Sequence, residues 1–319
     1  MNQLQQEILK VYKEFKGLCD DHGLRFYAAF GTALGAVRHQ GFIPWDDDVD
    51  VYMPYPDCLR LMDIINNSDT DLPVVMRNRC LDEDTLATIF KVSSKSNFYL
   101  EVPACQPKNF YGVFVDLFPL IGTPETETER DSFFREIVQL ERDIYFNERY
   151  VVNTKGKEIQ QLLDLFEAFD YDTSSRVASP QTNIRQRVFD REELDNLEEM
   201  VFEDTTIRIP KDYDTYLTKV YGDYMTLPDE SERVGHHADK AYIDLENSHS
   251  LYTNEIEKSP INDYFAYLNS EVIKLKQEIF RKNKRIRSLE KPGFKRLAWF
   301  VLYGLHRKFP RFKFGMKRR

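Results

Sequence analysis

The sequence contains few cysteines and none of the common short motifs that bind metal or nucleotide phosphate. Its four cysteines form no CxxC pair, and no histidines stand at zinc-finger spacing. This pattern is typical of reduced, structural thiols in a cytosolic protein. Walker (GxxxxGK[ST]) and GxGxxG sequences are also absent, which argues against P-loop and Rossmann phosphate sites.

Long apolar runs are missing as well. The longest, residues 297–305, is about half as long as a membrane-spanning helix requires. The N-terminal residues 1–15 lack the basic start and the apolar core of a signal peptide. We therefore expect the protein to be made in the cytoplasm and to stay there.

Charge is distributed unevenly along the chain. The 319 residues carry a net charge of −9. Residues 281–319 contain fifteen Lys or Arg and one acidic residue, a balance of +14, so the remaining residues carry −23. An acidic body with a basic tail suggests that the tail has an anionic partner of its own.

Apolar periodicity predicts an α+β chain whose later part is mostly helical. Helices are expected over 3–22, 55–66 and 254–288, with a further helix-rich region over about 126–203 that has polar breaks at 152–157 and 171–183. Strands are expected over 24–30, 49–53, 72–79, 86–93, 98–102 and 113–120. Residues 207–228 indicate the end of a strand, a helix and a loop.

Four aspartates lie within five positions, beside strongly apolar sequence: Asp46, Asp47, Asp48 and Asp50. Asp48 and Asp50 are two apart at the start of a predicted strand, so both side chains should point to the same face. Two carboxylates at such a short distance repel each other unless a cation lies between them. Mg²⁺ and Mn²⁺ accept oxygen ligands of this kind. A solvated acidic turn is the alternative.

Asp116 is a lone charge in the apolar segment GVFVDLFPL, residues 112–120. A carboxylate in a buried strand needs a partner. If this strand lies beside 49–53, three carboxylates converge on one metal cluster. The alternative is a salt bridge between Asp116 and a Lys or Arg.

The pair Gly31–Thr32 stands between a predicted buried strand and a helix, where free backbone N–H groups can hold phosphate oxygens. A small-residue turn, paired aspartates on the next strand and a third carboxylate on a later strand together resemble the plan of the nucleotidyltransferase fold shared with DNA polymerase β.

Three segments of the chain resemble the LicD family, which includes the fukutin-type phosphotransferases. They are FGTALGAVRHQGFIPWDDDVDVYMPYPD (30–57), GVFVDLFPL (112–120) and IPKDYDTYLTKVYGDYMTLPDESERVGHH (209–237). The resemblance implies a nucleotidyltransferase-like core, a mixed sheet with flanking helices, which takes a CDP-activated donor. It implies transfer of phosphocholine from CDP-choline to a sugar hydroxyl of teichoic acid, lipopolysaccharide or capsule precursors, with release of CMP. Fukutin-type relatives instead move ribitol phosphate from CDP-ribitol.

Position by position, the resemblance assigns Asp48, Asp50 and Asp116 to catalysis and metal binding, and Gly31 and Thr32 to the phosphate-binding turn. The expected metal is Mg²⁺ or Mn²⁺. Asp116 is expected to act as a metal ligand first and as a base second.

Other candidates surround these positions. Arg38 and Lys91 are candidates for holding the diphosphate, or are surface cations. For the substrate pocket the candidates are Trp45, Tyr52, Asp46, His236 and His237. Aromatic faces with an acidic residue nearby suit a quaternary ammonium group, whereas Trp45 alternatively packs to position the acidic loop.

Two other functional classes remain open. A glycosyltransferase also uses a DxD motif, but it normally has a larger nucleotide-binding unit before the motif, and only 47 residues precede Asp48. A non-catalytic glycan- or lipid-binding protein with a degenerate site is the second, although all three expected carboxylates are present.

The organisation expected is a catalytic core over 1–124, a helical region over 125–250 and a C-terminal helix with a basic aromatic tail over 251–319. For the tail, residues 291–319, peripheral contact with the inner face of the cell membrane is favoured, because aromatic and basic side chains alternate there. Docking on the acidic body is the alternative. Nucleic acid is not expected as a partner, because the acidic body would repel it.

Overall fold

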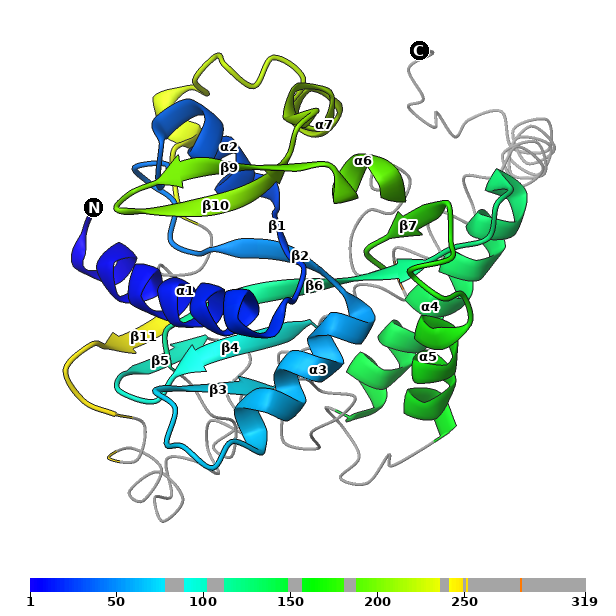
Figure 1. Cartoon of the computed structure of the whole chain (residues 1–319), viewed down its shortest axis with the longest axis horizontal. Coiled ribbons are helices and arrows are strands. Elements are labelled where there is room, and N and C mark those ends of the chain that lie inside the picture. The colour runs from blue at the N-terminus through cyan, green and yellow to red at the C-terminus, as the bar shows by residue number, and fades with distance from the viewer. Residues whose placement is uncertain are drawn as a thin grey trace, which may run out of the picture. The chain divides into compact units, whose positions relative to one another are not determined.

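The computed structural model describes residues 1–77, 89–101, 112–148, 157–180, 188–235, 241–248, 251 and 282. The chain divides into two compact units, 1–266 and 267–319. The second unit is described only at Lys282, and every helix and strand labelled in Figure 1 belongs to the first unit.

Helices and strands alternate over residues 3–77, and runs of strands and of helices follow one another after that (Figure 1). The helices are α1 (Gln3–His22), α2 (Phe30–His39), α3 (Tyr55–Asn66), α4 (Glu127–Glu148), α5 (Lys157–Glu167), α6 (Arg191–Asp195), α7 (Tyr213–Tyr221) and a short 3-10 helix at Glu230–Glu232. The strands are β1 (Tyr27–Ala28), β2 (Asp50–Pro54), β3 (Val74–Arg77), β4 (Phe90–Ser94), β5 (Phe98–Glu101), β6 (Phe114–Gly122), β7 (Arg176–Ala178), β8 (Val188–Asp190), β9 (Leu197–Phe202), β10 (Thr205–Pro210) and β11 (Ala241–Asp244).

A seven-stranded mixed sheet forms the centre of this unit. Its main path has the order β1-β2-β6-β4-β3, and β7 and β8 extend it from the far end of β6. The pair β2–β6 is parallel, whereas the other pairs in the sheet are antiparallel. Two further antiparallel pairs stand outside the sheet: the hairpin β9–β10, and β5–β11, which joins segments far apart in the sequence. The molecule is therefore an α+β protein.

Successive side chains of β2 and β6 point to opposite faces of the sheet. Val51, Met53, Val115 and Leu117 point to one face of β2 and β6 and are fully buried. The intervening positions, which include Asp50 and Asp116, point to the opposite face. Figure 1 shows α1 and α3 lying along the sheet, where their apolar faces cover the strands.

Helix α1 begins and ends on clear local signals. Asn2 and Gln5 form a reciprocal capping box, and Gly23 ends the helix in the left-handed region with φ 62°. The buried side of the helix is apolar at the expected spacing, so the sequence prediction over 3–22 is confirmed. The prediction of a helix over 55–66 is confirmed as α3.

Most predicted strands are present with shifted ends, and parts of those over 72–79, 86–93 and 98–102 fall outside the described residues. The strand over 24–30 is wrong in extent: only Tyr27–Ala28 pair, with β2, and α2 already begins at Phe30. The β1 ladder is short because the chain turns into α2 directly after Ala28.

The expectation of helix up to residue 203 is correct for α4, α5 and the short α6. It is wrong for the segments that form the short strands β7, β8 and β9. Strand β6 continues to Gly122, and its end pairs with β7, so backbone pairing decides the structure in this region rather than local apolar spacing. This pairing also carries the sheet past residue 124. The predicted helix over 254–288 lies outside the described residues except at Lys282.

No helix in the described ranges combines the length and the apolar character needed to cross a membrane.

Helix α2 packs very closely on the turn that follows it. A Cβ at Gly35 would collide with the backbone carbonyl oxygen of Gly41, which cannot move aside as a flexible side chain can. We expect Gly35→Ala to lower the free energy of unfolding by about 1–3 kcal/mol, as in other overpacked sites, measured by denaturant unfolding.

Gly17 in α1 is the matched control, because a Cβ there meets nothing within 4 Å. Gly17→Ala should raise stability by about 0.5–1 kcal/mol through helix propensity alone. An unchanged or higher stability for Gly35→Ala would show that α2 and the turn at Gly41 are not in close contact.

Candidate active site

A cavity of about 600 Å³ opens where three parts of the chain meet: α2, the loop before β2 and the segment after α7. Asp46, Asp48 and Asp50 line it, together with Gly31 and Arg38. The first and third of the segments singled out in the sequence therefore build one site, although more than 150 residues separate them.

Asp50, Asp116 and Lys91 form a row across three neighbouring strands. Asp50 of β2 is in register with Asp116 of β6, which is in register with Lys91 of β4. Paired residues in a sheet share a face, so the three side chains lie on the same side. The prediction that the strand of Asp116 lies beside that of Asp50 is confirmed. Asp116 is only 3% exposed.

Lys91 compensates the charge of Asp116. Its Nζ lies 2.7 Å from Asp116 Oδ1 and 3.4 Å from the centre of the Phe114 ring. A buried carboxylate needs such a partner, and the salt bridge considered as an alternative for Asp116 is present. Lys91 does not line the cavity, and its predicted contact with a diphosphate stays a prediction.

The tightest acidic group in the described residues consists of Asp46, Asp47 and Asp48, whose carboxylate oxygens lie within 4.8 Å of one another. Asp50 and Asp116 stand outside this group. Strand β2 begins only at Asp50, so Asp48 belongs to the preceding loop and the two-residue alternation of a strand does not govern it. The part of Asp48, Asp50 and Asp116 as metal ligands stays a prediction.

Neutral side chains hold the backbone of this acidic loop. The Gln5 amide nitrogen donates to the carbonyl oxygens of Asp46 (2.9 Å) and Ile43 (3.3 Å). The Thr32 hydroxyl accepts the N–H of Asp50 at 2.8 Å. Thr32 therefore fixes the start of β2, a role that the sequence did not suggest. A polar residue at a buried position of an amphipathic helix, as Gln5 is, was the available signal.

The turn between β9 and β10 forms hydrogen bonds with Gln40 and Phe42, just before the acidic loop. Glu203 accepts the N–H of Phe42 at 3.0 Å through its carboxylate, and its own N–H donates to the Gln40 carbonyl at 2.8 Å. Glu203 has a left-handed backbone with φ 55°. Nothing in the sequence indicated this contact, because it joins residues about 160 positions apart.

Gly31 lies in the first turn of α2, directly against the acidic loop. A Cβ at this position would stand 2.7 Å from Asp46 Oδ2, so a larger residue would displace that carboxylate. Gly235 has the same relation to Asp47, with which its Cβ would collide. Glycine at both positions lets two separate segments approach the aspartates closely.

Arg38 joins α2 to the segment after α7. Its Nη1 donates to the carbonyl oxygens of Tyr224 at 2.6 Å and Thr226 at 3.5 Å. Partial burial lowers the pKa of the guanidinium. Arg38 therefore helps to build the cavity wall while also lining the cavity.

The aromatic candidates separate in the structure. Trp45 lines the cavity, and the Arg233 guanidinium lies 5.5 Å from the centre of its ring, so the ring already contacts a cation. Tyr52 does not line the cavity: it is fully buried against other rings, because its position on β2 faces the packed end of the sheet. The proposed place of Tyr52 in the pocket is therefore wrong. His236 and His237 lie outside the described residues.

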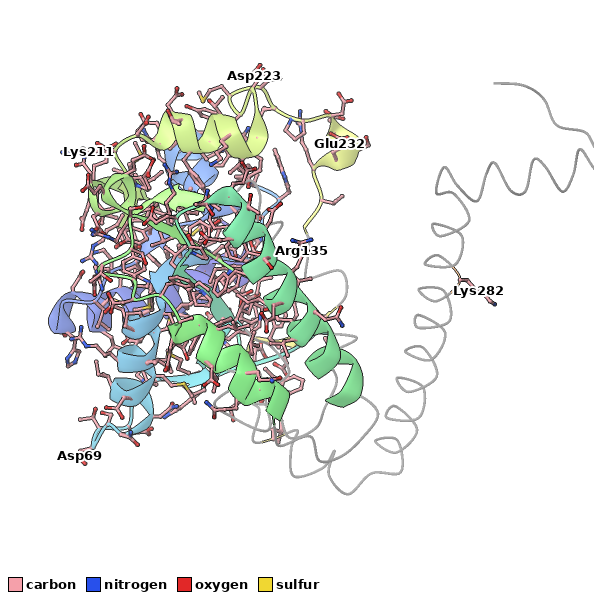
Figure 2. All side chains as sticks on the ribbon, turned by 90° about the vertical axis from the view of Figure 1, so that its right-hand side faces the viewer. Asp69, Arg135, Lys211, Asp223, Glu232 and Lys282 are labelled. Atoms are coloured by element: carbon pink, nitrogen blue, oxygen red, sulfur yellow. The ribbon has the colours of Figure 1, made fainter. Side chains whose placement is uncertain are left out.

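The end of α7 and the segment after it supply cavity residues that were not among the sequence-based candidates. Tyr221, Asp223 and Tyr224 line the cavity, and Figure 2 shows Asp223 at the exposed edge of this segment. The family resemblance of residues 209–237 was the signal that pointed to them.

Comparison with known proteins shows similarity over the part of the chain that contains the acidic loop. Residues 23–163 match the family model described as LicD/FKTN/FKRP, nucleotidyltransferase domain. The chain is similar to lipopolysaccharide cholinephosphotransferase LicD of Haemophilus influenzae, with 24% identity over 264 residues that cover 76% of this chain and 98% of that protein.

Two further relatives are uncharacterized Rickettsia proteins. The protein of Rickettsia typhi is 26% identical over 35% of this chain and 37% of its own length. The protein of Rickettsia prowazekii is 36% identical over 18% of this chain and 22% of its own length. Through residues 23–163, the chain carries a domain of the LicD family.

Proposed function

We propose that this protein is a phosphotransferase that moves phosphocholine from CDP-choline to a sugar hydroxyl of a cell-surface glycan precursor and releases CMP. The observation that carries the proposal is the acidic cavity, which unites the first and third family-like segments with the strand next to Asp116. Similarity along almost the whole length of a lipopolysaccharide cholinephosphotransferase supports the choice of donor and acceptor class.

The arrangement is also compatible with a nucleotidyltransferase-like core, which we include in the proposal. A short strand leads into a helix whose first turn carries Gly31, the acidic loop follows, and Asp50 and Asp116 lie on neighbouring parallel strands. These are the parts that the sequence pattern predicts for such a core.

The donor set suits a hard divalent cation. Four carboxylates line the cavity, Asp46, Asp48, Asp50 and Asp223, against one guanidinium, Arg38. Oxygen ligands of this kind bind Mg²⁺ or Mn²⁺, and we assign Asp48, Asp50 and Asp116 as the residues that would hold it. A bound cation would neutralise charge on the diphosphate and favour departure of CMP.

The chain's own groups orient the reaction. The acceptor hydroxyl oxygen attacks the phosphorus that carries choline, the bond from this phosphorus to the oxygen of CMP breaks, and the hydroxyl proton passes to a carboxylate of the cavity. We assign the first-turn N–H groups of α2 at Gly31 to the phosphate oxygens of the donor, because Gly31 lines the cavity at the start of a helix. Because Lys91 already compensates Asp116, we assign Asp116 the part of ligand rather than that of base.

The choline group would lie toward the aromatic wall. A quaternary ammonium binds aromatic faces with an acidic residue nearby. Tyr221, Tyr224 and Asp223 supply both kinds of group. Trp45 is the further candidate, although its ring already contacts Arg233.

A donor assay tests the proposal. The protein is incubated with Mg²⁺ and CDP-choline, CDP-ribitol or CDP-glycerol, with and without glycan acceptors, and CMP release is measured. Release from CDP-choline supports phosphocholine transfer. Release from a CDP-polyol alone would keep the mechanism and replace the substrate. Turnover of a sugar nucleotide instead would favour a DxD-type glycosyltransferase.

Loss of either strand-proximal aspartate should stop the reaction. We expect Asp48→Asn and Asp50→Asn each to lower kcat/KM at least 100-fold, about 2.7 kcal/mol in transition-state stabilisation, because each removes a charged oxygen donor from the cavity. Thermal unfolding should remain cooperative in both variants.

Asp69→Asn is the matched control, because Asp69 is exposed at the far end of the unit from Asp223 (Figure 2). It should retain wild-type turnover. Wild-type rates in Asp48→Asn or Asp50→Asn would refute the assignment of these carboxylates.

We also propose that the basic aromatic tail, 291–319, makes peripheral contact with anionic membranes. A chain that ends at Glu290 should float less with anionic liposomes than the full chain, and the difference should shrink at high salt because the attraction is partly electrostatic. Equal flotation of the two proteins would exclude a membrane role for the tail.

A further inference from the structure

Helix α2 begins with a backbone conformation that is unfavourable for its residue. Phe30, the first residue of the helix, has φ 43°. The left-handed region is costly for a bulky side chain and persists only where surrounding contacts hold it. Phe30 also lines the cavity, immediately before Gly31.

A hydroxyl group from the third family-like segment holds this conformation. Tyr216 on α7 accepts the N–H of Phe30 at 2.9 Å through its hydroxyl oxygen. The residue before the helix, Ala29, provides no side-chain cap, so Tyr216 takes the place of an N-cap side chain from a distant part of the sequence.

Ring packing fixes the position of that hydroxyl. Tyr216 is 8% exposed, and its ring centre lies 5.9 Å from that of Phe189 and 6.5 Å from that of Tyr52. Tyr52 in turn contacts Phe30 at 5.1 Å, and Phe118 contacts Phe30 at 5.0 Å. The donor residue and the acceptor residue thus belong to one packed aromatic cluster.

The φ angle of Phe30 sets the direction of the peptide that follows it. If Phe30 relaxed toward negative φ, the peptide plane between Phe30 and Gly31 would rotate, and the Gly31 N–H would turn with it. Gly31 lies at the cavity and against the carboxylate of Asp46. A change at Phe30 would therefore change the direction of the Gly31 N–H at the cavity.

We propose that Tyr216 is a positioning residue that holds Phe30 in its left-handed conformation and so aims the first-turn amide of α2 at the phosphates of the donor. The inference rests on the proposed function for the identity of that ligand. The hydrogen bond and the backbone conformation do not depend on it.

The test removes the hydroxyl alone. In Tyr216→Phe we expect amide hydrogen exchange in residues 30–34 to become at least tenfold faster, measured by mass spectrometry on the full chain. With the CDP donor that the wild type uses, KM for the donor should rise about tenfold while kcat changes little. A higher KM at constant kcat is expected when the ground state and the transition state lose the same binding interaction. A protein that is merely less stable instead loses kcat at unchanged KM.

Tyr12→Phe is the matched control. Tyr12 is fully buried, and its hydroxyl donates to the Thr206 carbonyl at 2.8 Å, so the variant also loses one buried bond to the backbone. It should leave both the exchange of residues 30–34 and the donor KM unchanged.

The outcomes are separable. Unchanged exchange over 30–34 in Tyr216→Phe, or a loss of kcat at constant KM, overturns the proposal. If the wild type releases CMP from no CDP donor, the proposed function fails, and the exchange measurement alone decides whether Tyr216 positions α2.

Discussion

Electrostatic repulsion among carboxylates is the constraint on which this structure depends. One carboxylate oxygen from each of Asp46, Asp47 and Asp48 lies within 4.8 Å of the others. Like charges at such short distances disfavour the folded loop. Hydrogen bonds to the backbone hold the loop against this repulsion. The Gln5 amide donates to two carbonyl groups, and the Thr32 hydroxyl accepts the N–H of Asp50. Such neutral contacts fix the loop through its backbone rather than through its carboxylates, and so they are compatible with uptake of a cation by the acidic oxygens.

Asp116 and the carboxylates that line the cavity differ in how their charge is compensated. The charge of Asp116 is compensated within the sheet by Lys91. The cavity, in contrast, has four carboxylates against the single guanidinium of Arg38. Under the proposed function, an anionic CDP donor would be repelled by these carboxylates, and bound cations would offset that repulsion. The positive group of a donor that carries choline would lessen it as well.

The sequence predicted the elements whose structure depends on neighbouring residues, and missed those that depend on contacts between distant segments. The period of apolar residues located α1 correctly. The strand of Asp116 lies beside that of Asp50, which was the condition set for the three carboxylates to converge. The Lys91 pair was foreseen only as an alternative. Strands β7, β8 and β9 escaped prediction because pairing stabilises them: β7 pairs with the end of β6, β8 with β7, and β9 with β10. Glu203 and Tyr216 escaped because their contacts join segments more than 150 residues apart.

The working unit of this fold extends beyond the residues that the family model matches. That match ends at residue 163, yet three independent contacts join the later segment to the site: Tyr216 holds the start of α2, Arg38 binds the carbonyl of Tyr224, and Gly235 packs against Asp47. The same segment provides one wall of the cavity. A fragment ending near residue 163 would keep the aspartates but lose that wall and the hydrogen bond from the Phe30 N–H to Tyr216. The cavity therefore requires the chain through at least residue 228.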